Sequence, residues 1–144
     1  MAPTILLVPG FWEGPTVFTS VCNILNSKGY PTTLASLPST GTTSPGNPSM
    51  SSDISAIRLV AQKLIEEEQK DVILVCHSAG GFLGSEAIEG LDAKGRSERG
   101  VKGGVRKIVF LAGGIAPAGQ EHVYLPFCDL SKGVSTVPHS SSNV

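Results

Sequence analysis

Short apolar runs alternate with amphipathic segments along the first 112 residues. Four runs are rich in β-branched side chains and bounded by glycine, proline or polar residues, which predicts strands at residues 4–8, 32–36, 72–75 and 105–112. Between them, apolar positions recur at helical spacing in segments that begin near Pro15, Ser51 and Ala79. Ser51 or Ser52 can cap the second helix, and the third is expected to span residues 79–91.

Strands that alternate with helices predict right-handed crossovers and a parallel sheet. We expect an α/β fold, a three-layer sandwich with a doubly wound, mostly parallel sheet of about four strands. If the second strand lies on one side of the first and the third strand on the other, the order is 2-1-3-4. The run at residues 72–75 is expected to be a fully buried strand. In this order the loops after the first and third strands open into one crevice, which is where ligands bind in such sheets.

Three segments carry no strand or helix pattern. Residues 37–49 contain three prolines and two glycines. Residues 92–104 form a polar stretch with four cations and four glycines, which we interpret as a mobile loop. After Gly113 we find no further strand–helix unit. We therefore expect one domain portion at residues 1–121, followed by the start of a cap or an irregular tail at residues 122–144.

Composition narrows the classes of ligand and partner that the chain is expected to bind. The 144 residues have a formal charge of −1, so no strong field favours nucleic acid or an anionic membrane, and a small molecule is the expected ligand. No segment is long enough to span a bilayer. The cysteines, Cys22, Cys76 and Cys128, are few, odd in number and widely spaced, which argues against disulfides or a zinc site. We expect a cytoplasmic protein with no metal and no cofactor.

Candidate chemistry centres on Ser78, which follows the third predicted strand and precedes the third predicted helix. A serine at such a sharp turn is typical of a nucleophile elbow, in which backbone strain exposes the hydroxyl. The positions two before and two after the serine must be small, and here they are Cys76 and Gly80. The sequence therefore reads Cys-x-Ser-x-Gly, in which a cysteine replaces the first glycine of the usual Gly-x-Ser-x-Gly pattern.

The loop after the first strand, Pro9-Gly10-Phe11-Trp12, is predicted to lie against Ser78. A serine that attacks a carbonyl needs N–H donors for the developing oxyanion. Ala79 N–H at the helix start and Phe11 N–H are the candidates. We expect Gly10 to permit close approach and Trp12 to cover the loop.

These residues resemble the α/β-hydrolase fold family, in particular its small esterase and hydroxynitrile-lyase-like branch. The resemblance covers roughly residues 4–121 and includes Leu-Leu-Val-Pro-Gly-Phe-Trp, Gly-Tyr-Pro-Thr-Thr-Leu, Val-Ile-Leu-Val-Cys-His-Ser-Ala-Gly-Gly and Ile-Val-Phe-Leu-Ala-Gly-Gly-Ile-Ala-Pro. It implies that Ser78 is the nucleophile, that Phe11 and Ala79 form the oxyanion hole, and that the substrate is a carboxylic ester. Pro9 departs from the histidine often found before the loop glycine.

The base and acid of a triad are not evident. The family places an acid and a histidine after two further strands, beyond a helical cap, so we expect this sequence to represent the N-terminal portion of such a hydrolase. Asp129 and His139 follow Ser78 in the order of a triad, but each further strand–helix unit needs about 30 residues. His77 should point away from Ser78 as a packing residue. His122 has no evident partner.

Two other functions remain open. A noncatalytic, truncated or degenerate hydrolase could bind a small ligand or a partner, and the unpaired edge of the fourth strand would then favour self-association. A flavodoxin-like or nucleotide-binding domain begins with the same strand order. However, Gly80-Gly81-Phe82-Leu83-Gly84 lacks the Gly-x-Gly-x-x-Gly spacing, and no Walker lysine motif occurs.

Overall fold

The computed structural model describes residues 2–42, 48–115, 128–129 and 134–135. The larger elements are β1 (Thr4–Val8), α1 (Thr19–Ser27), β2 (Thr32–Leu34), α2 (Met50–Gln62), β3 (Asp71–His77), α3 (Gly80–Ala87), α4 (Ala93–Glu98) and β4 (Gly104–Leu111). A 3₁₀ turn, η1 (Pro15–Phe18), precedes α1, and a π-helical turn, η2 (Lys63–Glu67), follows α2. None of the helices in the described ranges is long and apolar enough to cross a bilayer.

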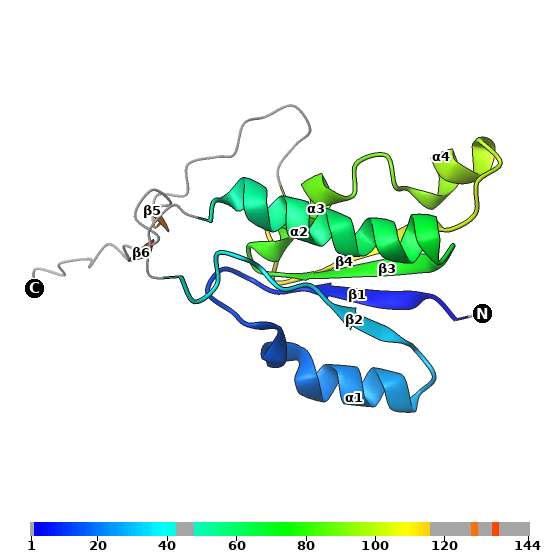
Figure 1. The fold of residues 1–144 in the computed structure, drawn as a ribbon. Helices are drawn as coiled ribbons and strands as arrows, with labels where there is room; N and C mark the ends of the chain where they lie inside the picture. Colours follow the sequence, from blue (N-terminus) through cyan, green and yellow to red (C-terminus); the bar gives the residue numbers. More distant parts are fainter. Residues whose placement is uncertain (1, 43–47, 116–127, 130–133, 136–144) are drawn as a thin grey trace, which may run out of the picture.

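Four parallel strands form the main sheet in the order β2-β1-β3-β4, which is the order expected when the second and third strands lie on opposite sides of the first. In register, Val8 of β1 lies beside Cys76 of β3, so these two strands end at the same level. One face of the sheet carries α1 and the other carries α2 and α3 (Figure 1). This is the expected three-layer arrangement, and it brings the loops after β1 and β3 together.

The two faces of the sheet have separate cores. Leu6 and Val8 of β1 point to the α2 and α3 side, where they join a large cluster that includes Ile57 and Leu83. Ile5 and Leu7 alternate with them and join a smaller cluster on the α1 side. The period of two along β1 therefore places the strand between two apolar layers, as a buried parallel strand requires.

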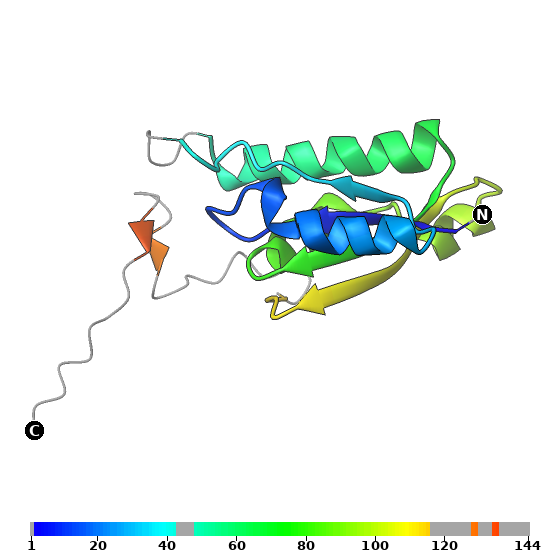
Figure 2. The ribbon, with the colours of Figure 1, turned by 90° about the horizontal axis from the view of Figure 1, so that it is seen from below.

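The small cluster covers its face of the sheet incompletely. Along β3, buried residues alternate with half-buried ones, so the prediction of a fully buried strand is wrong for the α1 side. The reason is geometric, because α1 lies over β1 and β2 while β4 runs beyond it (Figure 2). On η1 and α1, Phe18 and Cys22 face inward, whereas Val17, Val21 and Ile24 are exposed.

The second helix begins earlier than predicted. Its N-cap is Ser49, without a side-chain cap hydrogen bond, rather than Ser51 or Ser52. Asp53 in the first turn is fully buried and accepts two hydrogen bonds from Ser39, one from the backbone N–H at 2.9 Å and one from the hydroxyl at 2.6 Å. This carboxylate therefore holds the loop after β2 against α2.

Replacing Asp53 should destabilise the protein through that loop. In Asp53→Ala the half-buried Ser39 N–H and hydroxyl lose their acceptor, and we expect a loss of about 2–3 kcal/mol in the free energy of unfolding. Asp53→Asn keeps one acceptor oxygen and should lose less. Urea denaturation of the three proteins provides the measurement, and an unchanged midpoint for Asp53→Ala would contradict this assignment.

Two further helix predictions need correction. The third helix is shorter than expected, since α3 ends at Ala87 rather than near residue 91.

The polar stretch at residues 92–104 contains α4, which Asp92 caps by accepting a hydrogen bond from Gly95 N–H at 2.7 Å. Buried Arg96 then donates to the Gly103 and Lys102 carbonyls. A charged side chain satisfied by backbone acceptors thus orders a segment that its composition predicted to be a mobile loop.

A short antiparallel pair, β5 (Cys128–Asp129) and β6 (Val134–Ser135), lies in the second predicted portion of the chain. The sequence pattern did not predict these two-residue strands, which are too short to show a period. The proposed division at residues 121 and 122 falls outside the described residues.

Candidate active site

Ser78 occupies a left-handed backbone conformation immediately after β3, with φ at 51°. Such a conformation strains any residue with a Cβ, and it persists only where the surroundings hold it. The Ser78 carbonyl accepts hydrogen bonds from Gly81 N–H and Gly114 N–H, and its own N–H donates to the Leu111 carbonyl at 3.2 Å. β4 and α3 therefore clamp the turn that the sequence predicted.

The glycine after the turn is required by a backbone contact. A Cβ on Gly80 would lie 2.5 Å from the Pro9 carbonyl oxygen and 2.7 Å from that of Val8. A Cβ on Gly84 would lie 2.7 Å from the sulfur of Cys76, which confirms that the glycines of α3 allow close packing on the sheet. Burial raises the pKa of the Cys76 thiol to about 12, so this residue is a neutral packing group.

The loop after β1 approaches the serine through Gly10. A Cβ on Gly10 would lie 3.0 Å from Ser78 Cβ and 3.4 Å from Ser78 Oγ. Phe11 is half-buried and packs on the large core cluster, which anchors the loop. Trp12 has a φ of 63° and is 53% exposed, with its ring 5.7 Å from that of Phe11. The tryptophan therefore projects from the loop instead of covering it closely.

The two candidate oxyanion donors lie on the segments that flank Ser78. Ala79 is the N-cap residue of α3, and Phe11 follows the glycine that contacts the serine. In the part of the chain that the structure describes, neither backbone N–H donates a hydrogen bond to a protein acceptor. An N–H group without an acceptor among the described residues can donate to an oxyanion, so both groups stay candidates for the hole.

Sequence reasoning missed a pair of side chains beside the serine. Glu13 Oε2 lies 2.8 Å from His77 Nδ1 and also accepts a hydrogen bond from Gly10 N–H at 2.9 Å. Burial raises the pKa of Glu13, but the hydrogen bonds from Gly10 and His77 and the charge of His77 outweigh it, so the pKa falls below its usual value. His77 packs edge-on against Phe18 as predicted, yet it also makes this polar contact.

The structure does not assemble a triad from the residues that it describes. No hydrogen bond to Ser78 Oγ occurs among them. Asp129 lies in β5, whereas His139 and His122 fall outside the described residues. A search of the same ranges finds no group of three histidine, cysteine, aspartate or glutamate side chains that could hold a metal ion.

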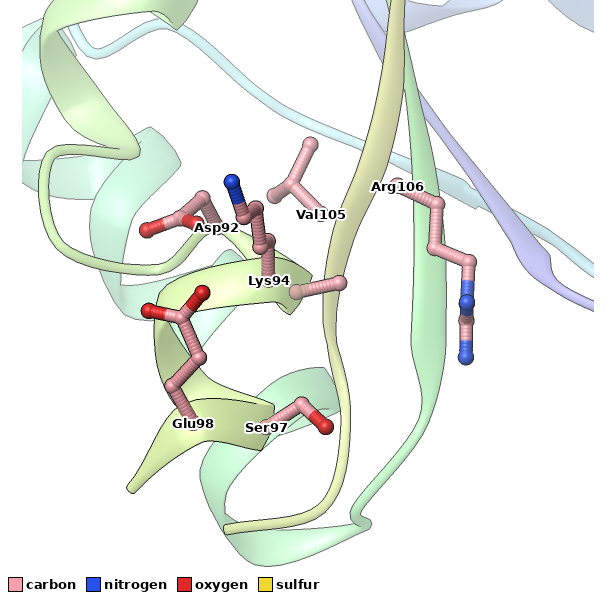
Figure 3. Close-up of a pocket in the computed structure, with 7 residues that line it drawn as sticks. Asp92, Lys94, Ser97, Glu98, Val105 and Arg106 are labelled. Carbon is pink, nitrogen blue, oxygen red and sulfur yellow. The ribbon is translucent and has the colours of Figure 1, made fainter. Parts of the chain in front are cut away.

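A polar hollow of about 570 Å³ lies between α4 and the start of β4. Asp92, Lys94 and Glu98 line it, and Arg106 extends to the other side of the strand (Figure 3). Arg106 Nε lies 2.8 Å from the carboxylate of Asp71. Because the hollow is at the amino end of β4, and Ser78 follows the carboxyl end of the adjacent parallel strand, it is separate from the serine site.

Comparison with known proteins agrees with the fold. The sequence model of the alpha/beta hydrolase family matches residues 5–134. A curated relative, the alpha/beta hydrolase nvfD of Aspergillus novofumigatus, is 32% identical over 120 residues, which are 83% of this chain and 46% of that protein. The chain therefore belongs to the alpha/beta hydrolase family. It spans about half the length of the curated relatives that it matches.

Two solved structures share the fold at lower identity. Tomato methylketone synthase I, crystallised with 2-tridecanone, has a TM-score of 0.63 and 19% identity, and the match covers 82% of this chain and 42% of that one. An extracellular alpha/beta-hydrolase from a Paenibacillus species has a TM-score of 0.52 and 19% identity, covering 80% and 42% of the two chains. In both cases the shared part is less than half of the larger protein.

Proposed function

We propose that this chain supplies the nucleophile and the oxyanion hole of a serine hydrolase that acts on a carboxylic ester. The observation that carries the proposal is the strained turn at Ser78, with Gly10 in close contact. A serine hydroxyl held by a rigid turn beside two N–H donors suits attack on a carbonyl carbon. Membership of the hydrolase family supports the same reaction class.

In this reaction, Ser78 Oγ attacks the ester carbonyl while the Phe11 and Ala79 N–H groups stabilise the negative oxygen of the tetrahedral intermediate. Expulsion of the alcohol leaves an acyl-serine, which water then hydrolyses. Because no base contacts Ser78 Oγ in the described residues, we expect turnover of simple esters to be slow. Residual catalysis by the oxyanion hole and substrate binding is on the order of 10³–10⁴ over water.

The proposed substrate is a small ester. The proposed reaction uses no nucleic acid, metal or cofactor. Two thiols in the described residues, Cys22 and Cys76, are free and buried, which fits a reducing compartment such as the cytoplasm. The proposal is tested with a fluorophosphonate probe, which forms a bond from serine oxygen to phosphorus as fluoride leaves. Peptide mass spectrometry should map the adduct to Ser78, and a protein that reacts only elsewhere would contradict the proposal.

A second candidate function is binding without catalysis, favoured by the exposed end of β4. Phe110 is 36% exposed and Leu111 is 41% exposed, and within the described ranges β4 has no strand on its outer side. An unpaired strand edge with apolar side chains favours association with another strand.

For this candidate we expect the chain to self-associate through β4. Light scattering should show a mass that rises with protein concentration, and Phe110→Lys should shift the equilibrium toward monomer by placing a charge on the edge. Val101→Lys is the matched control, because Val101 is 45% exposed but lies before the strand. A monomer at high concentration in the unmodified protein would contradict this prediction.

A further inference from the structure

Glu13 connects the two segments that meet at Ser78. Its carboxylate accepts the Gly10 N–H, while its own N–H donates to the Gly10 carbonyl at 3.3 Å, so residues 10–13 form a turn closed from both ends. The same oxygen lies 2.8 Å from His77 Nδ1, and His77 is the last residue of β3. Phe11, the candidate oxyanion donor, lies inside this turn.

The turn is also held from its outer side. Thr40 Oγ1 donates to the Glu13 carbonyl at 3.3 Å, and neighbouring Ser39 is fixed by buried Asp53. Gly10 itself lies between the carboxylate and the serine, since a Cβ there would be 3.0 Å from both Glu13 Oε2 and Ser78 Cβ. A shift of the Glu13 side chain would therefore move the loop relative to the nucleophile.

We propose that Glu13 and His77 form a positioning pair that holds the oxyanion loop, and thus Phe11 N–H, at a set distance from Ser78. The inference rests on the proposed hydrolase function and adds a role for two residues that do not touch the substrate. Oxyanion donors act only when they are fixed before the reaction, so a small displacement of the loop reduces the rate. The pair fixes the loop by linking Gly10 through Glu13 to His77, the residue before Ser78.

The alternative role is that of an ordinary surface ion pair. The side chains of His77 and Glu13 are 34% and 32% exposed, and pairs of this kind contribute little to global stability. The positioning role therefore predicts an effect on Ser78 reactivity that exceeds any effect on the melting temperature. Glu68 provides a matched control, because its side chain is 35% exposed and paired with Lys70, and it precedes the start of β3 whereas the elbow follows its end.

The experiment compares the unmodified chain with Glu13→Ala, Glu13→Gln and Glu68→Ala. We expect Glu13→Ala to slow fluorophosphonate labelling of Ser78 by about tenfold or more. Glu13→Gln should stay within about threefold, because its amide oxygen can still accept the Gly10 N–H. Glu68→Ala should label at the unmodified rate. Hydrogen exchange of the Gly10 amide, followed by NMR, should accelerate in Glu13→Ala and not in Glu68→Ala.

Two results would overturn the inference. One is a Glu13→Ala variant that labels at the unmodified rate. The other is a set in which Glu13→Gln loses as much reactivity as Glu13→Ala and the melting temperatures of both fall in parallel. If the unmodified chain does not label at Ser78, the proposed hydrolase function fails separately. The Gly10 amide then decides the inference, since unchanged exchange in Glu13→Ala refutes the positioning role and faster exchange supports it.

Discussion

Ser78→Ala should abolish fluorophosphonate labelling of the chain, because the probe reacts with a serine oxygen and alanine has none. The alanine keeps the Cβ and the backbone hydrogen bonds to Leu111, Gly81 and Gly114, so the fold should be retained. Ester turnover should stay near the same residual level in both proteins, on the order of 10³–10⁴ over water, because the unmodified chain already has no base in contact with Ser78 Oγ among the described residues. In-gel fluorescence and a chromogenic ester assay measure the two effects.

Ser85→Ala is the matched control for this experiment. Ser85 lies in α3, seven positions after the candidate nucleophile, and its hydroxyl donates to the Gly81 carbonyl at 2.7 Å. A serine bonded within a helix has no strained turn to activate it, so its removal should leave labelling unchanged. Full labelling of Ser78→Ala would show that the probe reacts at another residue and would refute the assignment of the nucleophile.

Gly80→Ala should produce the largest loss of stability among the single substitutions considered for this site. The new methyl group would lie 2.5 Å from the Pro9 carbonyl oxygen and 2.7 Å from that of Val8, and both contacts are with backbone. α3 or the loop after β1 must move, at a cost of about 3 kcal/mol. We expect a fall of about 10 °C in the melting temperature and a loss of Ser78 labelling.

Gly14→Ala separates this steric effect from the general effect of adding a methyl group. Gly14 lies near the same loop with an extended backbone at φ −77°, and the nearest atom to an added Cβ is Thr16 Oγ1 at 3.7 Å. The substitution should leave stability within about 0.5 kcal/mol, or raise it slightly by reducing the freedom of the unfolded chain. Equal melting temperatures for Gly80→Ala and Gly14→Ala would contradict the steric argument.

The principal strands could be predicted because each is a compact apolar run. β1 matches residues 4–8 without adjustment, and β4 begins and ends one residue earlier than the predicted residues 105–112. Their parallel direction followed from the helix between successive strands, whereas the crossover rule alone does not fix the strand order. The position of Ser78 at the turn after β3 followed from the sequence, because an apolar strand ends there beside residues that must be small.

Other features depended on contacts distant in sequence. α4 was missed because a six-residue helix with one cap carries no periodic signal. Buried Arg96 donates hydrogen bonds to backbone carbonyls outside that helix, a contact that the sequence does not reveal. Asp53 lies in the first turn of α2, where a negative charge suits the helix dipole, but its hydrogen-bond partner is Ser39, fourteen positions away. From the sequence alone, polar residues of this kind are expected to be exposed to solvent, because only the fold brings their partners close.

At Ser78 and the residues around it, some features likewise followed from the sequence and others only from the fold. By itself, the sequence determined the alternating strands and helices, the parallel direction of the strands and the small residues that a sharp turn requires, because these depend on local pattern and chain connectivity. Only the tertiary structure brought Glu13 to His77, 64 positions apart, with the same carboxylate oxygen accepting the Gly10 N–H. Contacts between loops depend on how strands end in register, which no local pattern encodes.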